Sequence, residues 1–374
     1  MDKIFVKIIK YTLLFLLIFI KNSYAQSLET ILKNSESELI SYVYGNQEKF
    51  EVQIILTELK KRGKSFTIHK KKFNSDKNNY FYPASSIKLP IALLTFEKIN
   101  ESSDLNINSE FSIQGDSIIT TFKKEITDLF IISSNESYNR LFEFLGQDYI
   151  NEKLKQKGFK DFSISHRLST KDSDNLETKE ITFYSNGEIL KIQKSIKNKP
   201  VSKLNLKNLN KGIGFISNNK LQNKPMDFSR KNYFSINELN NILICLFFPE
   251  ISKNKKFYLS KSQNLLIQKL MSSTPFEMGF DKNMYPNNYN KFFIYGDKNG
   301  MINDNIFNKV GNAYGYSIDN AYIYNKNSDR HFVITACIYT NANNILNDNN
   351  YEYDEIGIPF LAEIGRLLTK YDIR

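Results

Sequence analysis

A serine and a lysine three positions apart form the first pattern in this chain that could carry chemistry. Ser85 and Lys88 lie in the segment YPASSIKLP, residues 82–90, directly before the apolar run 91–96. Pro83 favours an extended residue or a turn before it, and serine is a good residue at a helix start. The spacing therefore predicts Ser85 and Lys88 one helical turn apart on the same face.

This spacing fits nucleophilic catalysis. A serine hydroxyl is a weak nucleophile until a base takes its proton. A lysine can be that base when partial burial and nearby positive charge lower its pKa. A helix N-terminus also directs a backbone N–H toward a developing oxyanion. The same spacing recurs at Ser252 and Lys255 in a polar stretch, so an isolated match carries little weight.

A second polar group stands at the end of the apolar helical pattern 126–132. It consists of Ser133, Ser134 and Asn135. Serine and asparagine are common at helix junctions, so these residues alone would indicate an ordinary turn.

A third group is the triplet 309–311 (KVG), which is followed by residues 312–315 and then by two predicted strands. Alone, such a triplet is usually a turn. A rival triplet begins at Lys298, but no paired strands follow it as closely.

In this order and context, the three groups resemble the motifs of class A β-lactamases within the β-lactamase and penicillin-binding protein superfamily. The resemblance covers residues 80 to 340 and implies an acyl-enzyme mechanism. It implies the following roles: nucleophile for Ser85, adjacent base for Lys88, proton shuttle to the leaving nitrogen for Ser133, binding of the substrate amide for Asn135, binding of a substrate carboxylate for Lys309, close backbone approach at Gly311, and the second oxyanion donor at the Asn312 N–H.

Two positions depart from the family pattern. Ser134 stands where the family has an aspartate, and a serine cannot reproduce that residue's structural contacts. Val310 lacks the hydroxyl that helps to hold a substrate carboxylate in the family. The resemblance therefore leaves open how well this chain binds ordinary β-lactams.

The loop that would support deacylation departs further. In class A enzymes it reads Glu-x-x-Leu-Asn, and its glutamate activates the hydrolytic water. Here Arg167 and Leu168 resemble the start of the loop, but no glutamate follows at the expected place. Asp172 and Asp174 are candidate deacylation bases with a shorter reach, since a base must lie within hydrogen-bond distance of its water. Acylation is thus predicted to be intact, whereas turnover stays open.

Both ends of the chain predict strands and helices. Residues 28–44 have helical periodicity, and a glycine turn joins the apolar runs 50–58 and 66–73 into a hairpin. Strands at 321–324 and 332–339 and an amphipathic helix at 356–367 follow near the C-terminus. We expect an α/β (α+β layered) fold, with an antiparallel sheet from both termini, packed helices and an all-helical middle subdomain.

One domain is expected after an export signal. Residues 1–25 carry an early lysine cluster, a ten-residue apolar run at 11–20 and a small-residue cleavage site, typical of a cleavable signal peptide. The domain would then span 26–374, with a lysine-rich insertion around 170–231 and a hairpin at 181–192. We expect a periplasmic or secreted monomer without a stable membrane anchor.

The composition excludes several other classes. The net charge of +11 comes from lysines scattered among asparagines, which is not the pattern of a nucleic-acid-binding module. The three histidines are isolated, so no metal site is expected, and no phosphate or dinucleotide motif indicates a cofactor. Cys245 and Cys337 lie in apolar runs and could be joined or remain two buried thiols.

Three functional hypotheses follow. The first is an exported serine hydrolase that opens a β-lactam or a related amide. The second is a D-Ala-D-Ala peptidase or penicillin-binding protein that acts on a peptidoglycan peptide and deacylates slowly, which the missing glutamate favours. The third is a binding protein that retains the fold without useful catalysis, which Ser134, Val310 and the insertion would favour.

Overall fold

The computed structural model describes residues 26–370 except 64, 77, 253–254 and 299–304. The predicted signal peptide, most of the rival triplet at 298–300 and part of the second serine–lysine copy lie outside the described residues. No helix among the described residues is long and apolar enough to span a membrane.

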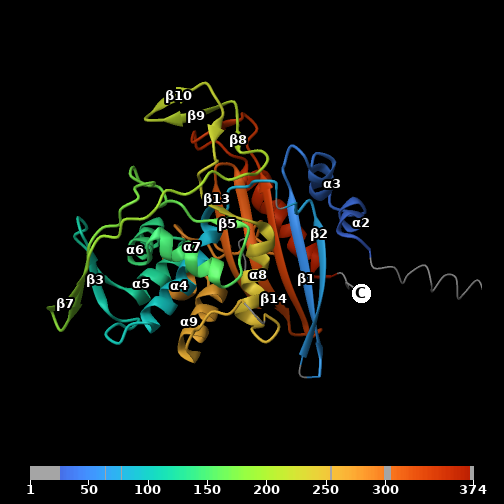
Figure 1. The fold of residues 1–374 in the computed structure, drawn as a ribbon. Helices are drawn as coiled ribbons and strands as arrows, with labels where there is room; N and C mark the ends of the chain where they lie inside the picture. Colours follow the sequence, from blue (N-terminus) through green and yellow to red (C-terminus); the bar gives the residue numbers. More distant parts are fainter. Residues whose placement is uncertain (1–25, 64, 77, 253–254, 299–304, 371–374) are drawn as a thin grey trace, which may run out of the picture.

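A five-stranded antiparallel sheet forms one part of the molecule (Figure 1). Its order is β13 (Asn305–Ala313), β14 (Tyr316–Asn325), β15 (Arg330–Tyr339), β1 (Gln53–Arg62) and β2 (Ser65–Phe73). The predicted hairpin at 50–73 and the two strands predicted at 321–324 and 332–339 are therefore confirmed; the latter also form a hairpin, and the two hairpins meet where β1 pairs with β15. The sheet is built from both ends of the chain, as expected.

Helices cover both faces of this sheet because side chains along β1 alternate between two apolar clusters. Ile54 and Leu56 belong to the cluster with α2 (Leu28–Lys33), α3 (Glu38–Gly45) and α10 (Ile358–Leu368), whereas Ile55 belongs to the larger cluster on the other face. On that face α8 (Ile236–Phe247) packs against β1, β14 and β15. Figure 1 shows α2 and α3 on one side and α8 on the other.

The single helix predicted at 28–44 is two helices. Asn34 ends α2, and the side chain of Ser37 accepts a hydrogen bond from the backbone N–H of Ile40 to cap α3. A capping serine three residues beyond the end of the first helix restarts the chain in a new direction, which periodicity alone did not reveal. The C-terminal helix is confirmed, and a π-helical turn, η3 (Tyr353–Gly357), precedes it.

The middle part of the chain is mainly helical but not all-helical. Its helices are α4 (Lys88–Asn100), α5 (Phe122–Ile131), α6 (Asn135–Leu145), α7 (Gln147–Gln156) and α9 (Lys261–Ser272). It also contains a four-stranded sheet in the order β4 (Ile119–Thr121), β3 (Glu110–Ile113), β6 (Ile181–Ser185) and β7 (Glu188–Gln193). The prediction missed β3 and β4 because short strands depend on distant partners, here β6.

The lysine-rich segment after residue 170 contributes β6 and β7, so its predicted hairpin is confirmed. The remainder forms short strands: β8 (Asn210–Lys211), β9 (Gly214–Ser217), β10 (Lys220–Gln222) and β11 (Met226–Asp227). β9 pairs with β16 (Ile345–Leu346) near the C-terminus. Two further strands, β5 (Phe162–Ser163) and β12 (Tyr233–Phe234), pair beside the helices.

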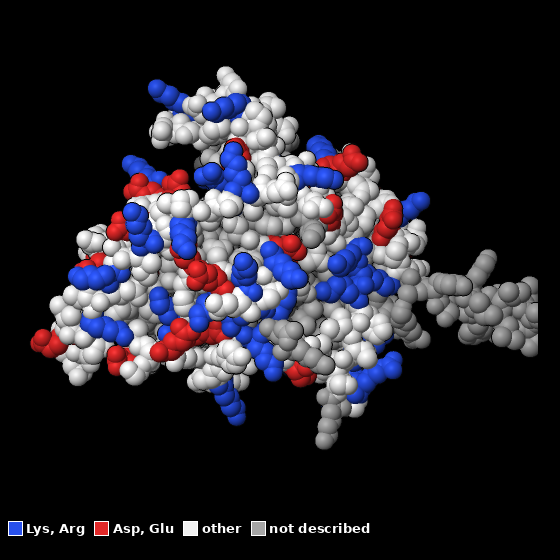
Figure 2. Space-filling model, viewed as in Figure 1, with Lys and Arg blue, Asp and Glu red and all other residues white. Residues whose placement is uncertain are grey.

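The cysteines and the surface charge bear on two further expectations. Cys245 in α8 and Cys337 in β15 are both buried and free, so of the two alternatives the structure has separate thiols. Figure 2 shows the Lys and Arg side chains of the visible face dispersed among acidic ones, without one continuous basic stripe.

Candidate active site

Ser85 lies in a tight turn that exposes it beside a buried helix. The turn is the 3-10 helix η1 (Ala84–Ile87), and α4 begins directly after it at Lys88. Ala84 has a φ of +46°, a left-handed conformation that a side chain rarely adopts. The Ser86 hydroxyl donates to the Pro83 carbonyl at 2.5 Å and closes the turn. Ser85 is partly exposed whereas its neighbours are buried, and Lys88 follows one turn later, as predicted.

Lys88 is fully buried and is held by the second motif. Its ammonium donates to the Ser133 carbonyl, to Asn135 Oδ1 at 2.8 Å and to Ser133 Oγ at 3.3 Å. Burial first, and then the charge of Lys309, lower the pKa of Lys88 well below its ordinary value, while the Glu136 carboxylate opposes them. Lys88 therefore has the environment that favours a neutral amine.

Ser133 lies between two lysines. Its φ of +54° turns the chain sharply between α5 and α6. Lys309 Nζ lies 2.8 Å from Ser133 Oγ and Lys88 Nζ 3.3 Å from the same atom. Ser134, which stands where the family has an aspartate, caps α6 by accepting from the Ser137 N–H at 3.0 Å. The hydroxyl of Ser133 therefore lies within hydrogen-bond distance of two lysine side chains.

Lys309 and Gly311 come from β13, the edge strand of the large sheet. Lys309 is buried and also donates to the Val310 carbonyl at 3.0 Å. Burial lowers the pKa of Lys309 to about 7, with Asp319 opposing and Lys291 adding to the shift. A Cβ at Gly311 would lie 2.5 Å from the backbone nitrogen of Ser85, so only glycine lets β13 approach η1 this closely. Asn312 follows and is exposed.

A buried polar network lies close to Lys309, and no motif in the sequence indicated it. Asn308 donates to the Asp319 carboxylate at 2.9 Å and accepts from Lys291 Nζ at 2.9 Å. The Phe293 N–H donates to the same carboxylate at 2.9 Å. Burial raises the pKa of Asp319 to about 6 and lowers that of Lys291 to about 8. The network keeps a carboxylate close to Lys309 without a direct ion pair.

The loop that follows residue 166 is fixed by a buried ion pair. Arg167 Nη2 lies 2.9 Å from Glu143 Oε2, and Arg167 also donates to the carbonyls of Asn175 at 2.7 Å and Glu177 at 3.0 Å. Leu168 is held through both backbone groups by the side chain of Asn139.

This loop presents Ser169, and not an acid, to the catalytic motifs. Asn135 Nδ2 donates to Ser169 Oγ at 3.0 Å, and the same asparagine holds Lys88 through its oxygen. Asp172 and Asp174 are exposed and are not among the residues that line the cavities beside Ser85. Thr170 and Ser173 of the same loop do line the first of these cavities, so the structure places the loop beside Ser85 but leaves both aspartate side chains exposed outside the lining.

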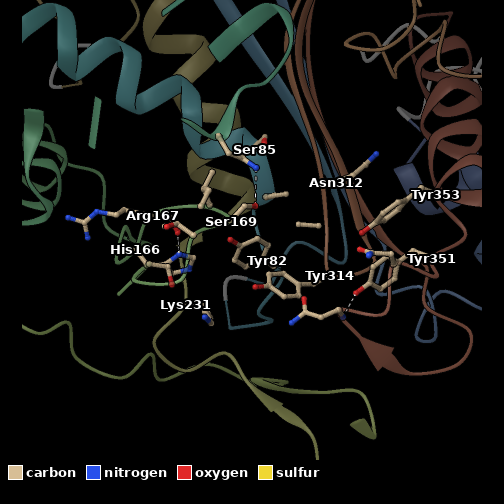
Figure 3. A pocket seen from close by; sticks show the side chains of 18 residues that line it. Tyr82, Ser85, His166, Arg167, Ser169, Lys231, Asn312, Tyr314, Tyr351 and Tyr353 are labelled. Carbon is tan, nitrogen blue, oxygen red and sulfur yellow. Dashed lines mark hydrogen bonds between the residues drawn. The ribbon is translucent and has the colours of Figure 1, made fainter. Parts of the chain in front are cut away.

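Two cavities meet at Ser85, Asn135 and Asn312. The first, of about 460 Å³, lies against the loop and is called here the loop cavity. The second, of about 400 Å³, also contacts Ser133, Val310 and Gly311 and lies against the turn 286–289; it is called the turn cavity. Sequence reasoning missed most of the loop cavity, since its walls come from separate segments (Figure 3). Those missed residues include Tyr82, His166, Lys231, Tyr314, Tyr351 and Tyr353.

Comparisons with solved structures found proteins of similar fold. The chain is similar to a class A β-lactamase from Bacteroides cellulosilyticus, with 10% identity, a TM-score of 0.53, and 92% of this chain and 98% of that one covered. It is similar to a mutant of PBP-A solved as an acyl-enzyme complex with penicillin G, with 12% identity, a TM-score of 0.54, and coverage of 93% and 99%. It is also similar to a β-lactamase from Xanthomonas campestris, with 10% identity, a TM-score of 0.52, and coverage of 91% and 99%.

These likenesses concern the fold. No curated protein matches the chain by sequence. The model of the beta-lactamase enzyme family, however, matches residues 36–371, nearly the whole described chain. The chain therefore belongs to the beta-lactamase enzyme family.

Proposed function

We propose that this protein is a serine hydrolase that a β-lactam or a related amide acylates at Ser85, with Lys88 as the base. The observation that carries the proposal is the convergence of Lys88, Ser133 and Lys309, joined by hydrogen bonds, beside a partly exposed serine. These residues come from α4, the α5–α6 turn and β13. A cluster with only a structural role would not require a partly exposed serine, Ser85, at the place where two cavities meet.

The acylation step uses each of these groups in turn. Neutral Lys88 takes the proton of Ser85 as its oxygen attacks the carbonyl carbon. The backbone N–H groups of Ser85 and Asn312 donate to the oxyanion that forms. When the carbon–nitrogen bond breaks, Ser133 gives its proton to the leaving nitrogen and is reprotonated by Lys88.

Lys309 has a binding role in this proposal. Its ammonium lies 2.8 Å from Ser133 Oγ, and Ser133 lines the turn cavity, so a carboxylate of the leaving portion placed beside Ser133 would pair with this ammonium. The Asn312 side chain is exposed at the same edge and can bind substrate amides. Val310 supplies no hydroxyl there, so the carboxylate depends mainly on the lysine.

A second candidate function is a peptidase or penicillin-binding protein that releases its acyl group slowly. The observation that favours it is the hydroxyl of Ser169, which lies beside Asn135, while none of the described residues that line the loop cavity carries a carboxylate. A hydroxyl cannot act as a general base near neutral pH. Nitrocefin kinetics distinguish the two: steady hydrolysis favours the first candidate, and a stoichiometric burst favours the second.

Intact-mass spectrometry after brief exposure to benzylpenicillin tests the nucleophile. The wild-type protein should gain the mass of one penicillin, and Ser85→Ala should gain none. Ser252→Ala is a matched control because Ser252 begins the other Ser-x-x-Lys sequence, and it should label like wild type. Labelling of Ser85→Ala would contradict the proposal. A folded wild-type protein that no acylating probe labels would favour the binding-protein hypothesis.

Export is part of the proposal. The lysine cluster and the apolar run in residues 1–25 support a signal peptide that is cleaved before Gln26. N-terminal sequencing of the protein recovered from the envelope of a Gram-negative host should begin at Gln26. Recovery of the protein in the cytoplasm with Met1 intact would contradict this.

A further inference from the structure

The two portions of the substrate, on either side of the bond that breaks, lie in different cavities; this step rests on the proposed function. Ser133, which would protonate the leaving nitrogen, lines the turn cavity and not the loop cavity. The leaving portion therefore lies in the turn cavity. The acyl portion, attached to Ser85 on the other side of the broken bond, extends into the loop cavity.

The loop cavity has a preformed aromatic wall. The hydroxyl of Tyr351 accepts from the Asn347 N–H at 2.7 Å, and that of Tyr353 accepts from the Gly315 N–H at 2.8 Å. The rings of Tyr82 and Tyr314 meet edge to face with centroids 4.8 Å apart. These contacts fix the rings before any ligand arrives, which reduces the entropy lost on binding.

Lys231 is a cation in the lining of this cavity. Its ammonium has no hydrogen-bond or ion-pair partner within the part of the chain that the structure describes. Arg167, the other cation that lines the cavity, is already neutralised by Glu143. Burial lowers the pKa of Lys231, and the nearby Asp174 carboxylate opposes this shift. The two side chains form no ion pair in the described structure. Figure 3 shows Lys231 and Ser85 at opposite sides of the cavity.

His166 adds a hydrogen-bond acceptor between these two ends. Its Nδ1 lies 2.5 Å from the Arg167 carbonyl, which can only accept, so Nδ1 carries the hydrogen. Nε2 is then a lone-pair acceptor, and it is buried without a partner. Burial lowers the pKa of His166 to about 4, which keeps the ring neutral near pH 7. A buried acceptor without a donor is costly and marks a place for a ligand N–H.

We propose that the loop cavity selects acyl groups whose side chain carries a carboxylate, with Lys231 as the cation that binds it. His166 Nε2 accepts a hydrogen bond from an amide N–H of the same side chain. The tyrosine rings cover the apolar atoms that lie between the scissile carbonyl and the carboxylate. A partly buried ammonium without an internal partner binds an external anion more strongly than a surface lysine does, because water screens it less.

Matched cephalosporins test this selectivity. The probes are 7-aminocephalosporanic acids acylated with succinyl, glutaryl or adipoyl chains, each compared with the neutral analogue in which the terminal carboxylate is a primary amide. The measured quantity is the second-order rate of Ser85 acylation. Wild type should prefer the carboxylate of at least one length by about tenfold, the effect of one charge-assisted hydrogen bond.

Two lysine variants show whether Lys231 is the cause. Lys231→Met should lose the preference while it keeps the rate for the neutral probes. Lys224→Met, an exposed lysine of the same insertion, should keep the preference. An unchanged preference in Lys231→Met, or none in wild type at any length, would overturn the inference.

Binding without reaction separates this inference from the proposed function. In Ser85→Ala, calorimetry should find the carboxylate probe bound more tightly than its amide partner, and Lys231→Met in that background should remove the difference. If wild type is never acylated but this difference is present, the proposed function fails and the anion site stands. If acylation proceeds but this difference is absent, the site fails alone.

Discussion

The two sides of Ser85 differ in how they are built. On one side, Lys88, Ser133 and Lys309 form a buried network in which every polar group has a partner. On the other side, the loop presents the exposed hydroxyl of Ser169, and Lys231 and His166 Nε2 have no partners in the described structure. In the proposed function, the first side breaks the scissile bond and the second side binds the acyl group.

Forming an acyl-enzyme and releasing its acyl group therefore place different requirements on the two sides. Acylation needs a base and a proton path in a dry environment, because burial is what lowers a lysine pKa. Release needs a base that faces water on the loop side, and the cavity there has no carboxylate in its lining within the part of the chain that the structure describes.

Replacement of Lys88 should have the largest effect. Lys88→Met should lower the rate of acylation by benzylpenicillin about 10³-fold, since it removes the general base. Methionine fits a buried site without a charge, so the melting temperature should not fall sharply. A variant that stays folded and still acylates within tenfold of the wild-type rate would show that another group takes the proton.

A carboxylate on the loop side should convert slow release into turnover. Ser169→Glu should raise the rate of deacylation about 10²-fold, because Ser169 Oγ lies 3.0 Å from Asn135 Nδ2 and a carboxylate there could act as a general base. Ser169→Gln has the same size without a base and should release the acyl group at the wild-type rate. Equal rates in the two variants would mean that the loop does not face the hydrolytic water.

The pH dependence of acylation should report Lys309. Burial lowers its pKa to about 7, so the ammonium that binds a substrate carboxylate is present below that pH and is lost above it. For the free enzyme, acylation at low benzylpenicillin concentration should therefore fall by up to about tenfold per pH unit above 7. In Lys309→Arg this decline should disappear, because a guanidinium stays charged. A profile that is the same in both proteins would contradict this role.

The smallest effect should come from Ser134. Ser134→Ala removes the cap of α6 and should lower the free energy of unfolding by about 1 kcal/mol, measured by urea denaturation. Ser134→Asp keeps a capping oxygen and should retain wild-type stability. Acylation should change little in either variant, because the Ser134 side chain caps a helix and does not contact Lys88. A large loss of acylation in Ser134→Ala would show that the turn at Ser133 depends on this cap.

Short-range features of this protein could be predicted from the sequence. The turn of helix between Ser85 and Lys88, the two hairpins and the C-terminal helix depend on residue types that are neighbours in the chain. The same reasoning failed where a short element needed a distant partner, as for β3 with β6. The resemblance of the three motifs to those of class A β-lactamases also predicted which distant residues form one site, but it did not predict the distances between them.

The tertiary structure alone decided what lies around Ser85. Lys309 and Ser133 are 176 positions apart, and their contact follows from how β13 packs against η1 at Gly311. It decided that Ser169 faces Asn135 while Asp172 and Asp174 point to solvent, although all lie within a few residues. The physical reason is that side-chain type determines local backbone preference and possible chemistry, whereas which groups meet, and how far burial shifts their pKa values, depends on the packing of the whole chain.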